Sequence, residues 1–454
     1  MTEPAPQPAS PARDATSAAT TSAAALARLA VLGSLYFAQG LPYGFFTQAV
    51  PVLLRQHGAS LSKIGFTALL TLPWALKFLW APLVDRWYWP RLGRRKSWIL
   101  PMQLASTVTL LVLAALPDGT EVSQLMVGVV LLNLFAATQD VATDGLAVEL
   151  LPPSERGLAN GLQVAGYRAG MIVGGGVLLA YFATLGPRGV FACMAALTVL
   201  SSVPLWLSRE APPPPAPPTL PRAQVTPSLA SDRAREHFFY QPGVGRILAL
   251  LFLYKAGTSL ATGMLRPFLS DAGLSLADLA WVLGTVGFVA GLLGALTGGA
   301  LVTPLGRRRA LILFGVTQAL SVGGYLYLAA AAPGRFAIYA ACAAEHFASG
   351  LGTAALFTAM MDWARPRHAA TDYTVQASTV VIATGLAQTV SGLVADAIGY
   401  AGTFLVAVAL CAVGTGAAWL LFPRRTPRGE DLPPPVGGAD ARTDGPGPQA
   451  DARR

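Results

Sequence analysis

The sequence has few charged residues, few cysteines and few histidines. Only 12% of its 454 residues are Asp, Glu, Lys or Arg, against about 25% in an ordinary soluble domain. Its three cysteines, Cys193, Cys342 and Cys411, lie far apart in apolar stretches, which argues against a disulfide framework or a metal site. Nucleotide loops of the Walker type and the common hydrolase motifs are missing. We therefore predict no cofactor, no metal and no enzymatic activity.

The sequence instead contains many long apolar segments. Hydrophobic residues make up 53% of the chain, and the mean hydropathy is +0.51. A soluble protein this apolar would need an implausibly large core, so we predict an all-α membrane protein with twelve transmembrane helices in a lipid bilayer. The twelve apolar segments are 26–54, 64–84, 98–116, 124–150, 158–184, 188–207, 245–270, 277–302, 310–332, 336–361, 374–396 and 401–422.

Polar segments divide these helices into two groups of six. Residues 1–25 are rich in Pro, Ala, Ser and Thr without a signal-peptide pattern, so we expect a disordered tail. Residues 208–244 contain the run PPPPAPP and several arginines, which is typical of a solvated linker. The expected domains are a six-helix half at 26–207, a second at 245–422, and a disordered tail at 423–454.

The net charge of +9 comes from basic residues that gather in particular loops. Because cytoplasmic loops carry an excess of Lys and Arg, we place both termini and the linker in the cytoplasm, and we expect no nucleic acid partner. The loop after the second apolar segment contains Arg86, Arg91, Arg94, Arg95 and Lys96, and the loop after the eighth contains Arg307, Arg308 and Arg309.

Ionisable residues also occur deep inside the apolar segments. Asp140 and Asp144 lie four residues apart, hence on one helix face, and Arg168 lies about ten residues into the next segment. A charge near the middle of a spanning helix costs roughly 2.5–3.5 kcal/mol and usually faces a partner or a watered cavity. We predict that Asp140 or Asp144 pairs with Arg168 along a substrate or proton pathway, with Lys77 as a second candidate partner. A static packing bridge is the alternative.

Further candidates lie on other segments. Lys255 could hold a carboxylate or phosphate, and Glu345 could carry a proton, whereas the adjacent His346 is expected to be a core histidine. A polar stripe on the first segment could bind a sugar or amide, or could join helices. The stripe contains Tyr36, Gln39 and Tyr43.

The loop after the second segment resembles the signature of the major facilitator superfamily. Asp85-Arg86 is followed by Gly93-Arg94-Arg95, with 87–92 as an insertion. The resemblance implies that Asp85, Arg86, Arg94 and Arg95 form a cytoplasmic gate between the halves, although the arginines could act only on topology. A weak internal repeat also matches 149–163 with 362–376, and so pairs Glu149 with Asp362.

A closer resemblance covers much of the first half. The stretch from Lys77 to Arg86, the dipeptide Gln139-Asp140, and Gly166-Tyr167-Arg168 resemble the muropeptide permease (AmpG type) and acetyl-coenzyme A transporter family, and 139–151 is also similar to major facilitator domain-containing protein 3. The chain has Ala147 where muropeptide permeases carry lysine. By resemblance, Gln139 and Tyr167 join the pathway.

The resemblance implies a function. We expect a monomeric, proton-coupled secondary transporter of a polar or anionic small molecule such as an anhydromuropeptide, working by alternating access in a bacterial inner membrane. Two alternatives stay open. One is a carrier of acetyl-coenzyme A or another amphiphilic anion, and the remoter one is a membrane receptor without transport. The coupling ion could also be an ion other than the proton.

Overall fold

The computed structural model describes residues 11–49, 72–117, 122–208, 210, 238–241, 243–331 and 334–423. Every regular element in these ranges is a helix, and none of these residues lies in a β-strand. Eight helices among them are long and apolar enough to cross a bilayer. The predicted all-α membrane fold is confirmed.

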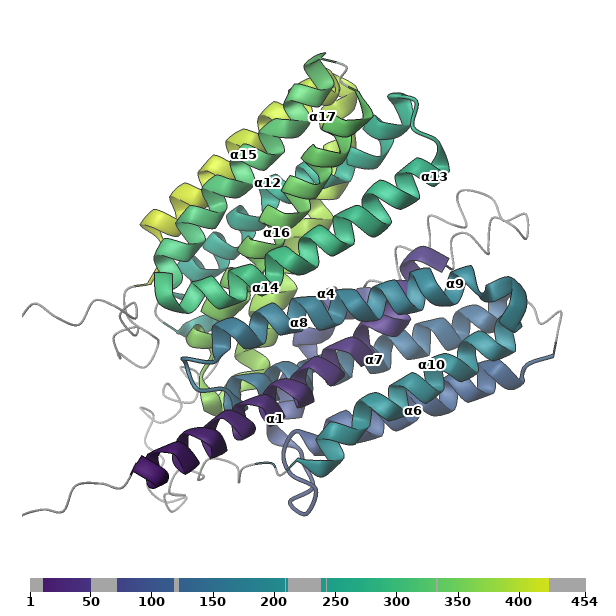
Figure 1. Ribbon diagram of the computed structural model, residues 1–454, viewed down its shortest axis with the longest axis vertical. Coiled ribbons are helices and arrows are strands. Elements are labelled where there is room, and N and C mark those ends of the chain that lie inside the picture. Colours follow the sequence, from purple (N-terminus) through teal and green to yellow (C-terminus); the bar gives the residue numbers. More distant parts are fainter. Residues whose placement is uncertain are drawn as a thin grey trace, which may run out of the picture.

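The helices gather into two bundles (Figure 1). The first contains α1 (Pro11–Gly44), η1 (Phe45–Ala49), α4 (Leu72–Leu76), η3 (Lys77–Leu79), α5 (Ala81–Arg86), α6 (Lys96–Ala115), α7 (Val122–Leu150), α8 (Arg156–Met171), η4 (Ile172–Val177), α9 (Leu178–Ala180) and α10 (Phe182–Leu207). After the short η6 (Phe238–Tyr240), the second contains α12 (Val244–Asp271), α13 (Leu276–Leu279), η7 (Ala280–Val286), α14 (Gly287–Leu305), α15 (Arg307–Ala331), α16 (Arg335–Trp363), η8 (Pro366–His368) and α17 (Ala369–Leu420).

Parts of the predicted division can be compared with these bounds. α1 begins at Pro11, so the expectation of a disordered tail is wrong for 11–25, where frequent alanine favours helix. Residues 1–10 and 424–454 of the predicted tails lie outside the described residues, as do most of the linker and the part of the second apolar segment before Leu72.

Two glycines turn the chain at matching places in the two bundles. Gly186 has φ 64° and ψ 175° inside α10, and Gly399 has φ 71° and ψ 178° inside α17. This backbone region is open essentially only to glycine. Each glycine therefore separates two helices, as the boundaries near 184–188 and 396–401 predicted. Both start the same pattern, Gly-x-x-Gly-x-Phe, which ends at the buried Phe191 and Phe404.

The eight membrane-crossing helices are fewer than the twelve predicted segments for identifiable reasons. α17 contains the last two segments in one span, and much of the second segment is outside the described residues. The fifth and tenth segments correspond to α8 and α16, which are not among the eight. These two helices carry Arg168 and Glu345.

α8 contacts both bundles. A side chain at Gly170 would come within 2.9 Å of the Cα of Gly40 on α1, and one at Gly161 would lie 2.7 Å from the carbonyl oxygen of Ala295 on α14. Small residues let helix backbones approach this closely in membranes. α8 thereby places Arg168 between the two bundles.

Candidate functional site

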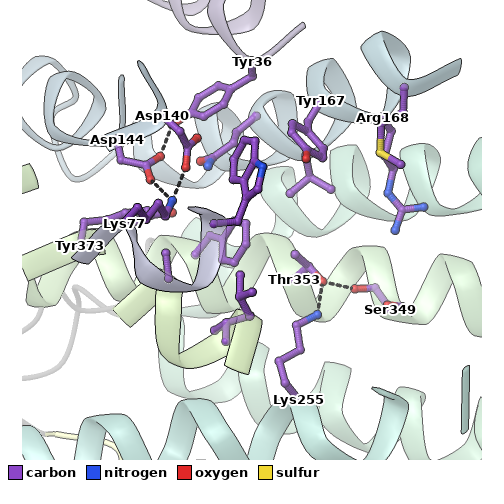
Figure 2. A pocket seen from close by; sticks show the side chains of 18 of the residues that line it. Tyr36, Lys77, Asp140, Asp144, Tyr167, Arg168, Lys255, Ser349, Thr353 and Tyr373 are labelled. Atoms are coloured by element: carbon purple, nitrogen blue, oxygen red, sulfur yellow. Dashed lines mark hydrogen bonds and ion pairs between the residues drawn. The ribbon is translucent and has the colours of Figure 1, made fainter. Parts of the chain in front are cut away.

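A cavity of about 460 Å³ lies between the bundles (Figure 2). Its walls come from α1, α4, η3, α7 and α8 on one side and from α12, α14, α16 and α17 on the other. Its polar and charged lining residues are Tyr36, Lys77, Asp140, Asp144, Gln163, Tyr167, Arg168, Lys255, His346, Ser349, Thr353 and Tyr373.

One wall carries what we call the Lys77 cluster, formed by Tyr36, Lys77, Asp140 and Asp144. The Lys77 ammonium forms an ion pair with Asp140, and its Nζ lies 3.6 Å from Oδ2 of Asp144. The Tyr36 hydroxyl donates a hydrogen bond of 2.8 Å to Oδ1 of Asp144. All four residues are buried, where an unpaired charge would be costly. Each charge in the cluster has a partner of opposite sign, which offsets that cost.

A second set of charges, which we call the cation pair, consists of Arg168 on α8 and Lys255 on α12, from opposite sides of the cavity. The Arg168 guanidinium lies 6.0 Å from the ring centre of Phe288, and Lys255 Nζ donates a hydrogen bond of 2.8 Å to Oγ1 of Thr353. Within the described part of the chain, neither cation forms an ion pair with a carboxylate. Figure 2 shows both side chains across the cavity from the Lys77 cluster.

The predicted pairing of Arg168 with Asp140 or Asp144 is therefore wrong. The second candidate, Lys77, is their partner. Counting residues gave similar depths for Asp140 and Arg168, but depth does not fix the direction in which a side chain leaves its helix. Arg168 points toward α14, where its guanidinium lies close to Gly291 and Phe288.

Aromatic rings form part of the cavity beside Lys77. The ring centres of Tyr43 and Tyr167 are 5.4 Å apart, and those of Tyr43 and Trp74 are 5.6 Å apart. Tyr167 and Trp74 line the cavity, whereas Tyr43 packs behind them. Trp74 is held in place because its Nε1 donates a hydrogen bond of 2.6 Å to Asn133.

Besides Tyr43 and Glu345, two other predicted pathway residues do not line this cavity. Gln39 is buried and donates a hydrogen bond of 3.2 Å from Nε2 to Oγ1 of Thr143 on α7. Gln139 is also buried. Neither is part of the cavity wall. For Gln39 the alternative interpretation, a polar contact between helices, fits the structure better.

Glu345 lies behind the cavity wall. It is buried on α16, where it accepts a hydrogen bond of 3.3 Å from the Tyr325 hydroxyl and lies 3.1 Å from Nδ1 of His346. His346 itself lines the cavity, although the sequence favoured a core histidine. The Glu345 carboxyl group therefore does not line the cavity itself, but it contacts a residue that does.

A cluster of ion pairs joins the bundles at one end, which we call the gate end. Asp85 lies 3.1 Å from Arg94 and 2.8 Å from Arg95, and Glu149 lies 2.9 Å and 2.7 Å from the same two side chains. From the other bundle, Thr371 donates to Asp85 through its backbone N–H at 2.8 Å and its hydroxyl at 2.6 Å. Burial opposes the ionisation of Asp85, but the nearby Arg95 charge and the Thr371 hydrogen bonds outweigh it and lower the pKa of Asp85.

A second cluster crosses between the bundles at the same end. Asp362 of α16 lies 2.8 Å from Arg156 of α8 and 2.8 Å from Arg307 of α15. Arg307 also donates a hydrogen bond of 2.6 Å to the carbonyl oxygen of Pro153. Asp362 thus takes the place that Glu149 has in the first cluster, which confirms the equivalence that the internal repeat predicted.

The structure brings together three of the four residues that were predicted to form a gate. Asp85, Arg94 and Arg95 meet as expected, but Arg86 is exposed and takes part in neither cluster as described. The sequence analysis did not assign Glu149, Arg156, Arg307, Asp362 or Thr371 to the gate. The match of Glu149 with Asp362 in the internal repeat, each near a basic loop, could have predicted most of these residues.

Comparisons with known proteins agree with this architecture. Residues 32–344 and 247–444 match the family model of the Major Facilitator Superfamily. The chain is 32% identical over 403 residues to the anhydromuropeptide permease of Escherichia coli K12, covering 88% of this chain and 80% of the permease. It is 33% identical over 380 residues to an uncharacterised protein of Haemophilus influenzae, covering 80% and 87%.

Solved structures share the fold at low sequence identity. The transporter FucP in its outward conformation has a TM-score of 0.64 at 14% identity and covers 88% of this chain and 99% of FucP. The human organic anion transporter MFSD10 has a TM-score of 0.66 at 15% identity and covers 87% and 99%. The chain belongs to the major facilitator superfamily and is a multi-pass membrane transporter rather than an enzyme.

Proposed function

We propose that this transporter moves a polar, anionic small molecule by proton-coupled alternating access. The cation pair is the observation that carries the proposal. Two positive side chains face one cavity without a carboxylate partner in the described residues, and lone charges inside a membrane are costly. A carboxylate or phosphate group on a solute would supply the missing partner through charge-assisted hydrogen bonds.

An anhydromuropeptide is the solute class that we favour. A volume of about 460 Å³ falls within the range of roughly 300–1,000 Å³ for small-molecule sites. Trp74 and Tyr167 present aromatic rings to it, which suits a solute with apolar sugar faces, and one relative is named for anhydromuropeptides. Acetyl-coenzyme A or another amphiphilic anion is the alternative, because it could use the same cation pair.

Alternating access would move residues 26–207 against 245–422. The bundles converge at the gate end and diverge toward α9 and α13 (Figure 1). We assign the gate end to the cytoplasm because its loops are basic, with both termini on that side of a bacterial inner membrane and the protein acting as a monomer. Opening it would separate Asp85 from Thr371 and Arg307 from Pro153. A receptor without transport would have no need for a breakable contact of this kind.

Uptake by proteoliposomes tests the proposal. Wild-type protein should accumulate radiolabelled anhydromuropeptide when a proton gradient is imposed and only equilibrate it when the gradient is collapsed. An excess of unlabelled acetyl-coenzyme A should compete poorly, whereas strong competition would favour the amphiphilic anion. Binding without uptake would favour a receptor. The absence of both binding and uptake, for both solutes, would refute the proposal.

A further inference from the structure

Two buried polar side chains in the cavity wall have atoms without hydrogen-bond partners. Gln163 on α8 is 8% exposed, and Tyr373 on α17 is 1% exposed. In the described residues, neither Oε1 of Gln163 nor the hydroxyl of Tyr373 has a hydrogen-bond partner. Other buried polar atoms of the described chain also lack partners, but only these two belong to residues that line the cavity. The cavity therefore offers two polar groups that a solute can satisfy.

The two residues are neighbours that come from different bundles. The Tyr373 hydroxyl approaches the Gln163 side chain without the geometry of a hydrogen bond. Gln163 lies five residues before Arg168 on α8, which separates them by about 7.5 Å along the helix axis. Figure 2 shows Tyr373 beside the Lys77 cluster and across the cavity from Arg168 and Lys255. The two polar groups are thus distinct from the cation pair but face the same cavity.

The free atoms of these side chains match a secondary amide. Oε1 of a glutamine only accepts hydrogen bonds, whereas a tyrosine hydroxyl can donate one. A secondary amide has an N–H donor and a carbonyl acceptor side by side, so it can donate to Gln163 and accept from Tyr373 at the same time. A carboxylate cannot donate to Oε1. The chemistry of this place therefore differs from that of the cation pair, which requires an anion.

We propose that Gln163 and Tyr373 form an amide-binding subsite, and that the transported solute is an anion that carries a secondary amide. The anionic group binds the cation pair, the amide N–H donates to Gln163, and the amide carbonyl accepts from Tyr373. A solute without the amide leaves both buried groups unpaired, and such sites select strongly against the analogue that lacks the hydrogen-bonding group. The inference rests on the proposed transport of an anion and narrows its solute class.

Thermal stability without any solute provides the first test. An unpartnered buried hydroxyl costs free energy, so Tyr373→Phe should melt at or above the wild-type temperature in detergent. Tyr254→Phe is the matched control, because the similarly buried Tyr254 hydroxyl donates a hydrogen bond of 3.0 Å to the carbonyl oxygen of Leu311 and lies outside the cavity wall. The control should melt below wild type. If Tyr373→Phe melts as early as Tyr254→Phe, the Tyr373 hydroxyl has a structural partner and the proposal is overturned.

Competition binding tests the subsite itself. Against labelled anhydromuropeptide, unlabelled N-acetylmuramic acid should compete better than 3-O-(1-carboxyethyl)-glucose, which keeps the carboxylate but has a hydroxyl in place of the acetamido group. Tyr373→Phe and Gln163→Met should each reduce this preference about 2- to 12-fold, as expected for the loss of one hydrogen bond. Arg168→Gln should weaken the binding of both acids and keep the preference, and Tyr254→Phe should also keep it.

The outcomes distinguish the amide subsite from the proposed function. Equal binding of the two acids by wild type, or a preference that both subsite variants retain, would overturn the subsite and leave anion transport standing. Tighter binding of the hydroxyl analogue would assign the two side chains to sugar hydroxyls and would also overturn it. If wild type binds neither acid and no labelled anhydromuropeptide, the proposed function fails and the inference fails with it.

Discussion

The two sets of charged residues around the cavity differ in how their charges are matched. In the Lys77 cluster, one ammonium serves two carboxylates and a phenol completes the set. In the cation pair, two positive groups face the same space with only Thr353 and the Phe288 ring as partners in the described residues. The Lys77 cluster is buried, whereas Arg168 and Lys255 are half-buried, but the degree of burial alone does not identify the ligand site. The ligand site is identified instead by the sign of the charges that have no partner of opposite sign.

This difference predicts which charged residues stabilise the fold and which bind the solute. Removing a member of a matched set should destabilise the fold, because it leaves a buried charge alone. Removing an unmatched cation should spare the fold and weaken binding. The substitutions below compare the Lys77 cluster, the cation pair and the gate end.

Lys77→Met should have the largest effect. It would leave Asp140 and Asp144 buried side by side without a cation, and breaking a buried pair in this way costs about 3–5 kcal/mol. We expect a marked loss of folded protein and of thermal stability in detergent.

The double variant Lys77→Met/Asp140→Asn is its matched control. It removes one carboxylate together with the ammonium and should recover most of the lost stability. Equal melting temperatures for Lys77→Met and wild type would mean that the Lys77 cluster is not a structural ion-pair set.

Arg168→Gln should have the next largest effect, on binding instead of folding. A hydrogen bond to a charged group contributes about 1.5–3 kcal/mol, which corresponds to roughly 10- to 150-fold in affinity for an anionic solute. Equilibrium binding of labelled anhydromuropeptide would measure it, with the melting temperature near that of wild type. A variant that binds normally but melts early would place Arg168 with the structural charges.

Asp85→Asn should have a smaller effect that depends on pH. Because the pKa of Asp85 is lowered in the folded protein, its carboxylate stabilises the fold above its ordinary pKa near 3.8, and this contribution is lost as the pH falls through the lower folded value. At neutral pH the variant should be about 1–3 kcal/mol less stable.

Thermal melts across pH would check this. The gap between Asp85→Asn and wild type should be widest at neutral pH and should narrow below about pH 4. The exposed Asp396 provides the control Asp396→Asn, for which no gap is expected. A gap that widens on acidification would contradict the sign of the argument.

Arg86→Gln should have the smallest effect. Arg86 is exposed beside the gate end and is absent from both of its clusters as described. We expect uptake and melting temperature within error of wild type, whereas Arg95→Gln should lower both, because Arg95 contacts Asp85 and Glu149. A defect in Arg86→Gln as large as that in Arg95→Gln would restore Arg86 to the gate.

The sequence was most informative where hydropathy and loop charge decide the outcome. It predicted the helical fold and the meeting of Asp85 with Arg94 and Arg95. It failed where rotation about a helix axis decides, as with Arg168 and Gln139, because spacing along one helix does not reveal which neighbour a side chain meets. It also missed partners from distant segments, such as Thr371, which only the packing of the two bundles brings to Asp85.

The glycine corners at Gly186 and Gly399 have an evolutionary consequence. Both precede the final helix of a bundle with nearly the same backbone angles, and any other residue would be strained there. If an ancestral gene for six helices was duplicated, divergence could erase most of the kinship between the copies but would have little freedom at these two sites. We therefore expect the shared Gly-x-x-Gly-x-Phe pattern to be the sequence similarity between the two halves that is lost last.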